Sequence, residues 1–272
     1  MSNLSNDLAF PPIIYKYRHW DEPFHADILT NNEIFFSHPD TLNDLDDCNV
    51  PMRYDLLTKE EIAKKVEYLV RLVHPNWNDD AIAYEVKFRL NQGHLSDLNF
   101  LKQHSEESLK KFRDAIGIYC TSKTCLDPMM WGHYCKNNTG FCVGFNADKL
   151  HQDSGGTIGE VIYFDGDYVL KPSDDWSIDY IKQSRLKKRQ WNYEQEIRIV
   201  KTYIPNPTIA ERKIKIKSET IEELYLGCKI SSENKNAIIS LLNTRNDLKH
   251  IKLFQMEKPL GVLGYNILPI NR

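Results

Sequence analysis

A chain of 272 residues that is 41% hydrophobic and 27% charged has an ordinary globular composition and is long enough to bury a sizeable core in one large domain. The formal net charge of -3 excludes a globally basic surface that would draw the protein to nucleic acid or to an anionic membrane. No stretch approaches the roughly 18 consecutive apolar residues of a membrane helix, and the N-terminus lacks a secretory signal, so we expect a soluble, cytoplasmic protein.

Two short strands with a helix between them are predicted near the N-terminus. Ile13 to Arg18 and Glu33 to Ser37 are rich in β-branched and aromatic residues, and 21–30 has the pattern of a short helix. The next segment is dense in carboxylates and amides: Asp40, Asn43, Asp44, Asp46 and Asp47. These residue types dominate turns and helix caps, and a cation site is the alternative, although the glycine of an EF-hand loop is missing.

A block of three helices is predicted at about 55–115. Thr58 and Glu61 have the spacing of a capping box, and the apolar residues that follow fall on one helical stripe. Further amphipathic helices are predicted over 79–92 and 95–115. We interpret this block as a scaffold or lid inserted between strands.

Strands and helices then alternate to the C-terminus. We expect strands over 117–123, 141–145, 155–164, 212–217, 221–227, 251–256 and 261–267, and helices over 128–140, 178–190 and 233–243. Asp127 and Pro128 have the order of an N-cap and first helical residue, and Gly140 that of a left-handed cap. The pattern predicts a single α+β domain over 1–272, with a mostly antiparallel sheet and the helical block between early and middle strands.

Six cysteines occur, and we expect them to be reduced and buried because the chain lacks an export signal. Zinc is the alternative, since several of them lie close to His133, although no C-x-x-C pair is present. The favoured interpretation includes no metal.

The most unusual stretch is Trp191 to Val200, which we interpret as a strand. Side chains of a strand alternate, so Glu194, Glu196 and Arg198 share one face at spacings of roughly 7 Å. Two carboxylates beside a guanidinium suit acid/base chemistry or a hydroxylated ligand, and an exposed, salt-bridged strand is the alternative. The motifs of Rossmann dehydrogenases, P-loop NTPases, zincins and α/β-hydrolases are absent.

Several motifs resemble the landmarks of a bacterial family known as domain of unknown function 2971. They are Y-K-Y-R, F-S-H-P-D-T-L-N-D, G-I-Y-C-T-S-K, M-M-W-G-H-Y followed by G-F-C-V-G-F, and W-N-Y-E-Q-E-I-R, with I-E-E-L-Y-L-G as a weaker one. The family name implies no activity.

A more distant resemblance is to ADP-ribosyltransferases of the R-S-E type. These enzymes carry an arginine on an early strand, S-T-S on a middle strand and E-x-E near a later one. Here Arg18, the sequence Cys120-Thr121-Ser122 and the sequence Glu194-Gln195-Glu196 occur in that order, with a cysteine in place of the first serine. The resemblance implies an ADP-ribosyltransferase-like fold and NAD as substrate.

The roles implied by this resemblance make chemical sense. Glu196 would stabilise the oxocarbenium-like transition state of nicotinamide–ribose cleavage, and Glu194 would orient or deprotonate a protein, nucleic-acid or water acceptor. Arg18 would bind the pyrophosphate, and Ser122 would hydrogen-bond the ribose or brace the first strand. The remaining candidates for the dinucleotide site are Thr121 and three aromatic residues that could stack on nicotinamide: Tyr119, Trp131 and Tyr193. The resemblance to domain of unknown function 2971 hints at a bacterial defence or toxin setting.

Two other functions stay open. A metal-dependent nuclease or phosphotransferase would require the carboxylates of 44–47 to join Glu194 and Glu196 around Mg²⁺. A binding or sensor module would use the acidic strand and the basic cluster of 185–189 as a partner surface.

Overall fold

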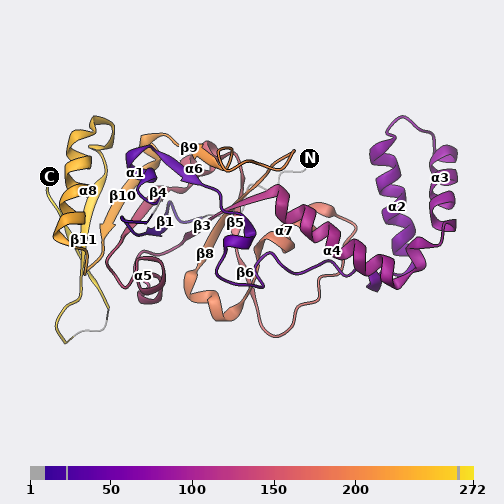
Figure 1. The fold of residues 1–272 in the computed structure, drawn as a ribbon, viewed down its shortest axis with the longest axis horizontal. Helices are drawn as coiled ribbons and strands as arrows, with labels where there is room; N and C mark the ends of the chain where they lie inside the picture. Colours follow the sequence, from indigo (N-terminus) through magenta and orange to yellow (C-terminus); the bar gives the residue numbers. More distant parts are fainter. Residues whose placement is uncertain (1–9, 23, 262–263) are drawn as a thin grey trace.

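The computed structural model describes residues 10–22, 24–261 and 264–272 (Figure 1). Within them an eight-stranded sheet has the order β12-β11-β10-β4-β1-β3-β8-β5. Its strands are β1 (Ile13–Arg18), β3 (Ile116–Ser122), β4 (Phe141–Asn146), β5 (Thr157–Glu160), β8 (Glu196–Thr202), β10 (Ile221–Leu226), β11 (Lys252–Glu257) and β12 (Asn266–Pro269). All neighbours are antiparallel except β10 and β11, so the predicted α+β class with a mostly antiparallel sheet is confirmed.

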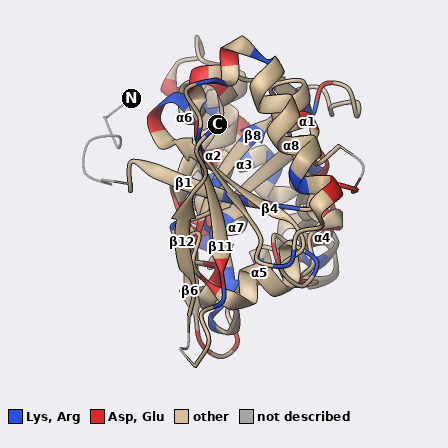
Figure 2. Cartoon of the chain, turned by 90° about the vertical axis from the view of Figure 1, so that its left-hand side faces the viewer, with Lys and Arg blue, Asp and Glu red and all other residues tan. Residues whose placement is uncertain are grey.

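Two small sheets and the helices complete the described fold. The small sheets pair β2 (Glu33–Phe35) with β9 (Lys213–Lys215), and β6 (Ile162–Phe164) with β7 (Leu186–Lys188). The helices are α1 (Asp27–Thr30), α2 (Lys59–Val73), α3 (Asp79–Asn91), α4 (Leu98–Ala115), α5 (Pro128–Tyr134), α6 (Ala147–Ser154), α7 (Trp176–Arg185) and α8 (Ser232–Thr244). The basic and acidic residues are interspersed along the ribbon (Figure 2).

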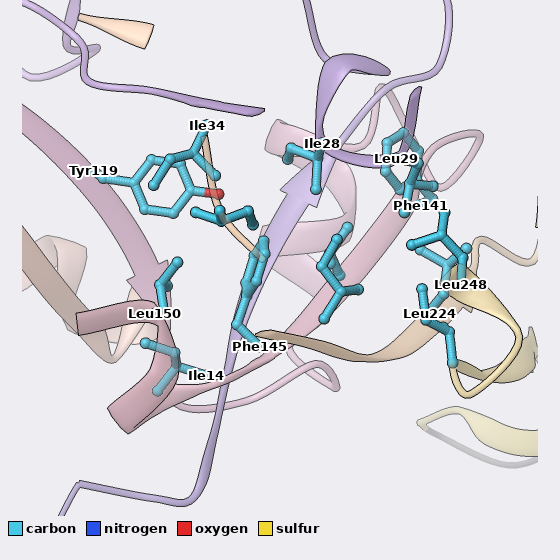
Figure 3. Close-up of a cluster of buried hydrophobic side chains, with 14 of the residues drawn as sticks. Ile14, Ile28, Leu29, Ile34, Tyr119, Phe141, Phe145, Leu150, Leu224 and Leu248 are labelled. Atoms are coloured by element: carbon cyan, nitrogen blue, oxygen red, sulfur yellow. The ribbon is translucent and has the colours of Figure 1, made fainter. Parts of the chain in front are cut away.

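The main core lies on one face of the large sheet, where α1, α6 and α8 cover it. Ile28 and Leu29 of α1 and Leu150 of α6 pack there with Phe141 and Phe145 of β4 (Figure 3). The alternation of β4 places its aromatic residues on this face and Cys142 on the other, where α5 packs. The helices therefore fix the central strands from both sides.

The helical block begins as the capping pattern predicts and extends away from the sheet (Figure 1). Thr58 accepts a hydrogen bond from the Glu61 backbone, and the Glu61 carboxylate accepts one from the Thr58 backbone. Helices α2 and α3 bury a small cluster of their own around Val66, Val70 and Ile82. Helix α4 returns to the sheet and leads directly into β3.

Several predicted element boundaries are wrong. The stretch Trp191 to Val200 is not one strand, because a 3₁₀ helix runs over Arg189–Glu194 and Gln195 has a φ of 42°. The helix predicted over 178–190 ends at Arg185 and gives way to β7. The predicted strand 155–164 is interrupted between β5 and β6. Gly140 has no positive φ; instead the left-handed residues are 136–138, where the chain turns earlier.

Two predicted elements extend beyond the described residues. The predicted helix 21–30 includes Pro23, and the helix observed is the shorter α1. The predicted strand 261–267 includes 262–263, and β12 is found slightly later.

All six cysteines carry free thiols; Cys48, Cys125, Cys135 and Cys142 are buried, and Cys120 and Cys228 are half-buried. None of the described helices combines the length and the apolar character needed to cross a membrane.

Candidate functional site

Five charged side chains from distant parts of the sequence meet beside the large sheet. Each is at most 4% exposed, and we call them the charged cluster: Asp47, Lys187, Glu194, Glu196 and Arg198. Asp47 lies in a turn after the 3₁₀ helix Pro39–Thr41, and Lys187 lies on β7. Glu194 ends the 3₁₀ helix Arg189–Glu194, and the other two lie on β8. Burying so much charge is costly unless the charges are paired, so their mutual geometry decides whether the fold tolerates them.

Arg198 forms two bidentate contacts. Its nitrogens lie 2.8 Å from both carboxylate oxygens of Asp47, and 2.8 and 2.9 Å from those of Glu196. A further hydrogen bond goes to the Ser184 carbonyl at 2.7 Å. The planar guanidinium is thereby satisfied, and it holds the two carboxylates in fixed positions.

Lys187 lies between all three carboxylates. Its Nζ is 2.5 Å from Glu194, 3.3 Å from Glu196 and 3.6 Å from Asp47. Burial acts to lower the pKa of Lys187, but the carboxylates outweigh it and raise the pKa well above its usual value. The Lys187 amine therefore stays charged and partly neutralises the three carboxylates of the charged cluster.

Glu194 and Glu196, which the alternation of a strand predicted on one face, have different environments. Burial acts to raise the pKa of Glu196, but Arg198 and Lys187 overcome it and hold that pKa well below its usual value. For Glu194 burial prevails over Lys187, and the negative charge of Glu196 adds to it, so the pKa of Glu194 is raised. Glu196 therefore stays ionised, and Glu194 is the carboxylate whose ionised form is opposed by burial.

A short hydrogen-bond chain leads from Glu194 toward the surface. The hydroxyl of Tyr134, on α5, donates to Glu194 at 2.5 Å. The exposed Asn43 donates its amide to the same hydroxyl at 2.8 Å. Because Gln195 is left-handed, the backbone turns before β8 and Glu194 approaches the cluster from the 3₁₀ helix.

A cavity of about 190 Å³ opens next to the cluster. Of the residues predicted from sequence, Arg18, Thr121, Glu194 and Glu196 line it, and Asp47 and Lys187 line it too. The Thr121 hydroxyl is already used, because it donates to the Ile197 carbonyl at 2.7 Å. Arg18 and both glutamates therefore face one cavity.

Strand β1 contributes two cations to this cavity, Lys16 and Arg18. Within the described part of the chain, the Arg18 guanidinium has neither an ion-pair partner nor a hydrogen bond, and burial lowers its pKa. Lys16 donates to the Cys120 carbonyl at 2.5 Å and lies 4.8 Å from the centre of the Tyr119 ring. The carboxylates opposite are paired within the cluster, so the Arg18 guanidinium is available to an anion.

The other predicted site residues lie outside the cavity. Ser122 is fully buried, and its hydroxyl accepts from the Thr124 backbone at 3.3 Å. Tyr119 is part of the main core, and the fully buried Trp131 donates its indole N–H to the Cys125 carbonyl. The Tyr193 hydroxyl lies 3.1 Å from His133 Nδ1. No aromatic ring of the predicted stacking set lines the cavity.

Sequence reasoning did not find Lys16, Tyr134 and the central place of Lys187. The signal for Lys16 was available, because it stands two residues before Arg18 and strand alternation puts both on one face. Lys187 looked like part of a basic surface cluster. In the structure Arg185 and Lys187 are buried, while Lys188 and Arg189 form exposed ion pairs with Asp46 and Asp165.

The remaining aspartates of 44–47 do not join the cluster. Asp46 is paired with Lys188, and Asp44 accepts a hydrogen bond from the Asp46 backbone at 3.1 Å. Across the described residues no group of three or more His, Cys, Asp or Glu side chains has the arrangement to hold a metal ion.

Comparison with known proteins gives one match. No curated protein and no solved structure matches the chain. Residues 130–199, which run from α5 into β8 and include most of the charged cluster, match the family described as "Protein of unknown function (DUF2971)". Over this segment, the match supports the resemblance to that family which the sequence motifs indicated.

Proposed function

We propose that the cavity binds NAD and that the protein transfers ADP-ribose to an acceptor or hydrolyses the dinucleotide. The observation that carries this proposal is the placement of Arg18, a guanidinium with no partner among the described residues, in the same cavity as Glu194 and Glu196. An arginine and a carboxylate facing one cavity are two of the three groups that the R-S-E resemblance implies. The third, Ser122, and the predicted aromatic stacking residues lie outside this cavity.

Each group has a chemical task in this reaction. Cleaving the nicotinamide–ribose bond develops positive charge on the ribose, which the permanently ionised Glu196 stabilises. Glu194, with its raised pKa, accepts the proton of the attacking acceptor or water. Arg18 binds the pyrophosphate with its fork of N–H donors. A cavity of about 190 Å³ is smaller than the ~300–1,000 Å³ of typical ligand pockets, so it encloses only one end of the dinucleotide.

The test is nicotinamide release from NAD by the full chain. We expect Glu194→Gln to lower the rate by about 10²–10⁴-fold, the usual contribution of a general base. Glu160→Gln is the matched control, because Glu160 forms an ion pair with Lys123 outside the cavity. Release at the wild-type rate by both Glu194→Gln and Glu196→Gln would overturn the proposal.

A metal-dependent phosphotransferase or nuclease is the alternative, because Asp47, Glu194 and Glu196 converge. The geometry weakens it: Lys187 Nζ lies where these carboxylates meet, and no described group of His, Cys, Asp or Glu side chains is arranged to hold a metal ion. Thermal shift separates the two candidates, since a ligand at 100 times its Kd stabilises by about 2.7 kcal/mol. A shift with NAD alone favours ADP-ribosyl transfer, whereas a shift that requires Mg²⁺ and a nucleotide favours phosphoryl chemistry. If neither NAD nor Mg²⁺ with a nucleotide shifts the melting temperature, a non-catalytic binding module is the remaining candidate.

A further inference from the structure

Lys16 differs from the other lysine at the cavity. Lys187 has three carboxylates within 4 Å, whereas Lys16 has no carboxylate at ion-pair distance in the described part of the chain. The partner of the Lys16 amine is the Cys120 carbonyl, and the amine also lies over the Tyr119 ring. Both contacts are compatible with a neutral amine, because neither supplies a full negative charge.

The charges around Lys16 favour loss of its proton. Burial and the positive charge of Arg18, two residues along β1, lower the pKa of Lys16 to about 7. Cys120 on β3, with Glu196 and Glu194 across the cavity, acts in the opposite direction and only partly compensates. A desolvated lysine beside a second cation is a known way to make an amine nucleophilic at neutral pH.

We propose that Lys16 forms an imine with a small 2-oxo acid whose carboxylate is bound by Arg18. The two side chains point to the same face of β1 and line the same cavity, which is large enough only for a small molecule. The lone pair of the Lys16 nitrogen attacks the keto carbon, a proton passes from nitrogen to oxygen, and the resulting carbinolamine loses water to leave a C=N bond. No oxidant or cofactor is needed.

Reductive trapping tests this reactivity. The full chain is incubated with pyruvate, the imine is reduced by borohydride to a stable secondary amine, and peptide mapping by mass spectrometry locates the adduct. We expect the adduct on Lys16, with half-maximal labelling near its pKa of about 7. Lys123 is the matched internal control, because its amine forms an ion pair with Glu160 at 2.6 Å and should stay unlabelled.

The role of Arg18 is tested with an uncharged probe. Because Arg18 also lowers the pKa of Lys16, the two probes are compared at the high-pH plateau of each variant's labelling profile, where the amine is unprotonated. There Arg18→Met should reduce labelling by pyruvate by about tenfold, the effect of losing one charge-assisted contact, and leave labelling by acetone within about twofold. An equal loss with both probes would remove Arg18 from the proposal. Lys16→Met removes the amine and should abolish labelling. Little change in melting temperature is expected, because Lys16 has no carboxylate at ion-pair distance among the described residues.

Labelling spread equally over Lys16 and Lys123, or no labelling of Lys16 at any pH from about 6 to about 9, would overturn the inference. The assay contains no NAD, so its failure is distinct from failure of the proposed NAD chemistry.

Discussion

At the scale of single residues, the pKa values of Glu194 and Glu196 shift in opposite directions, which strand alternation in the sequence could not predict. Both carboxylates are buried to the same extent, yet one is held by Arg198 and Lys187 and the other by Lys187 and Tyr134. The guanidinium makes the difference, because two parallel charge-assisted bonds favour the ionised form more than burial opposes it.

The two glutamates should therefore respond differently to neutralisation. Glu196→Gln leaves Arg198 with an uncompensated bidentate site, and we expect it to lower the free energy of unfolding at neutral pH by about 3 kcal/mol. Burial opposes the ionised form of Glu194, so Glu194→Gln should cost less, about 1 kcal/mol. Urea unfolding of both variants measures the difference, and equal losses would contradict this reading of the cluster.

The loss in free energy of unfolding caused by Glu196→Gln should also depend on pH. The pKa of Glu196 is lower in the folded state, so its stabilisation is present above the unfolded value of about 4.3 and is lost as pH falls through the folded value. The gap between the variant and the wild type should shrink below about pH 4.3, as unfolding curves at several pH values will show.

At the scale of elements, close backbone contacts position the strand that carries Lys16 and Arg18. A Cβ on Gly140 would lie 2.1 Å from the Arg18 carbonyl oxygen, where β4 begins beside the end of β1. The turn that precedes Gly140 holds three successive left-handed residues, which bring α5 to an end and direct the chain to the start of β4. Glycine is needed here for space, not for a positive φ.

Alanine substitutions at two neighbouring glycines test this contact. Gly140→Ala must push β4 away from β1, and we expect a loss of about 1–3 kcal/mol in the free energy of unfolding. Gly132→Ala is the control on α5, because its Cβ would meet nothing within 4 Å, and it should stabilise by about 0.5–1 kcal/mol. Denaturant unfolding of the two variants gives both values, and shifts of the same sign would be inconsistent with the close approach.

At the scale of the whole molecule, the helices α2 and α3 stand apart from the sheet (Figure 1). Their apolar cluster is small, and among their described contacts with the rest are Lys65 with the Ser173 carbonyl and Glu61 with Lys171. A unit with few buried apolar contacts opens at a lower free energy than the central core.

The capping box of α2 should therefore stabilise α2 and α3 against local unfolding. Thr58→Ala removes a cap worth about 1 kcal/mol, and we expect faster amide hydrogen exchange in α2 and α3 with exchange in β3 and β8 unchanged. Ser231→Ala removes the corresponding cap of α8, which packs on the main core, and serves as the comparison. Acceleration throughout the sheet by Thr58→Ala would show that the two helices are not a separate unit.

The sequence by itself determined the fold class, most element positions and the charged pair on β8, because strand alternation, helical stripes and caps act over a few neighbouring residues. The boundaries around Arg189–Glu194 escaped it, since strand alternation does not predict the left-handed turn at Gln195 that lies between Glu194, paired with Lys187, and β8. Only the tertiary structure decided that Asp47 and Lys187 complete the cluster, that Ser122, Tyr119 and Trp131 are core residues, and that Lys16 and Arg18 face the open cavity. Burial and charge pairing depend on residues far apart in the chain, and no local pattern encodes which of them meet.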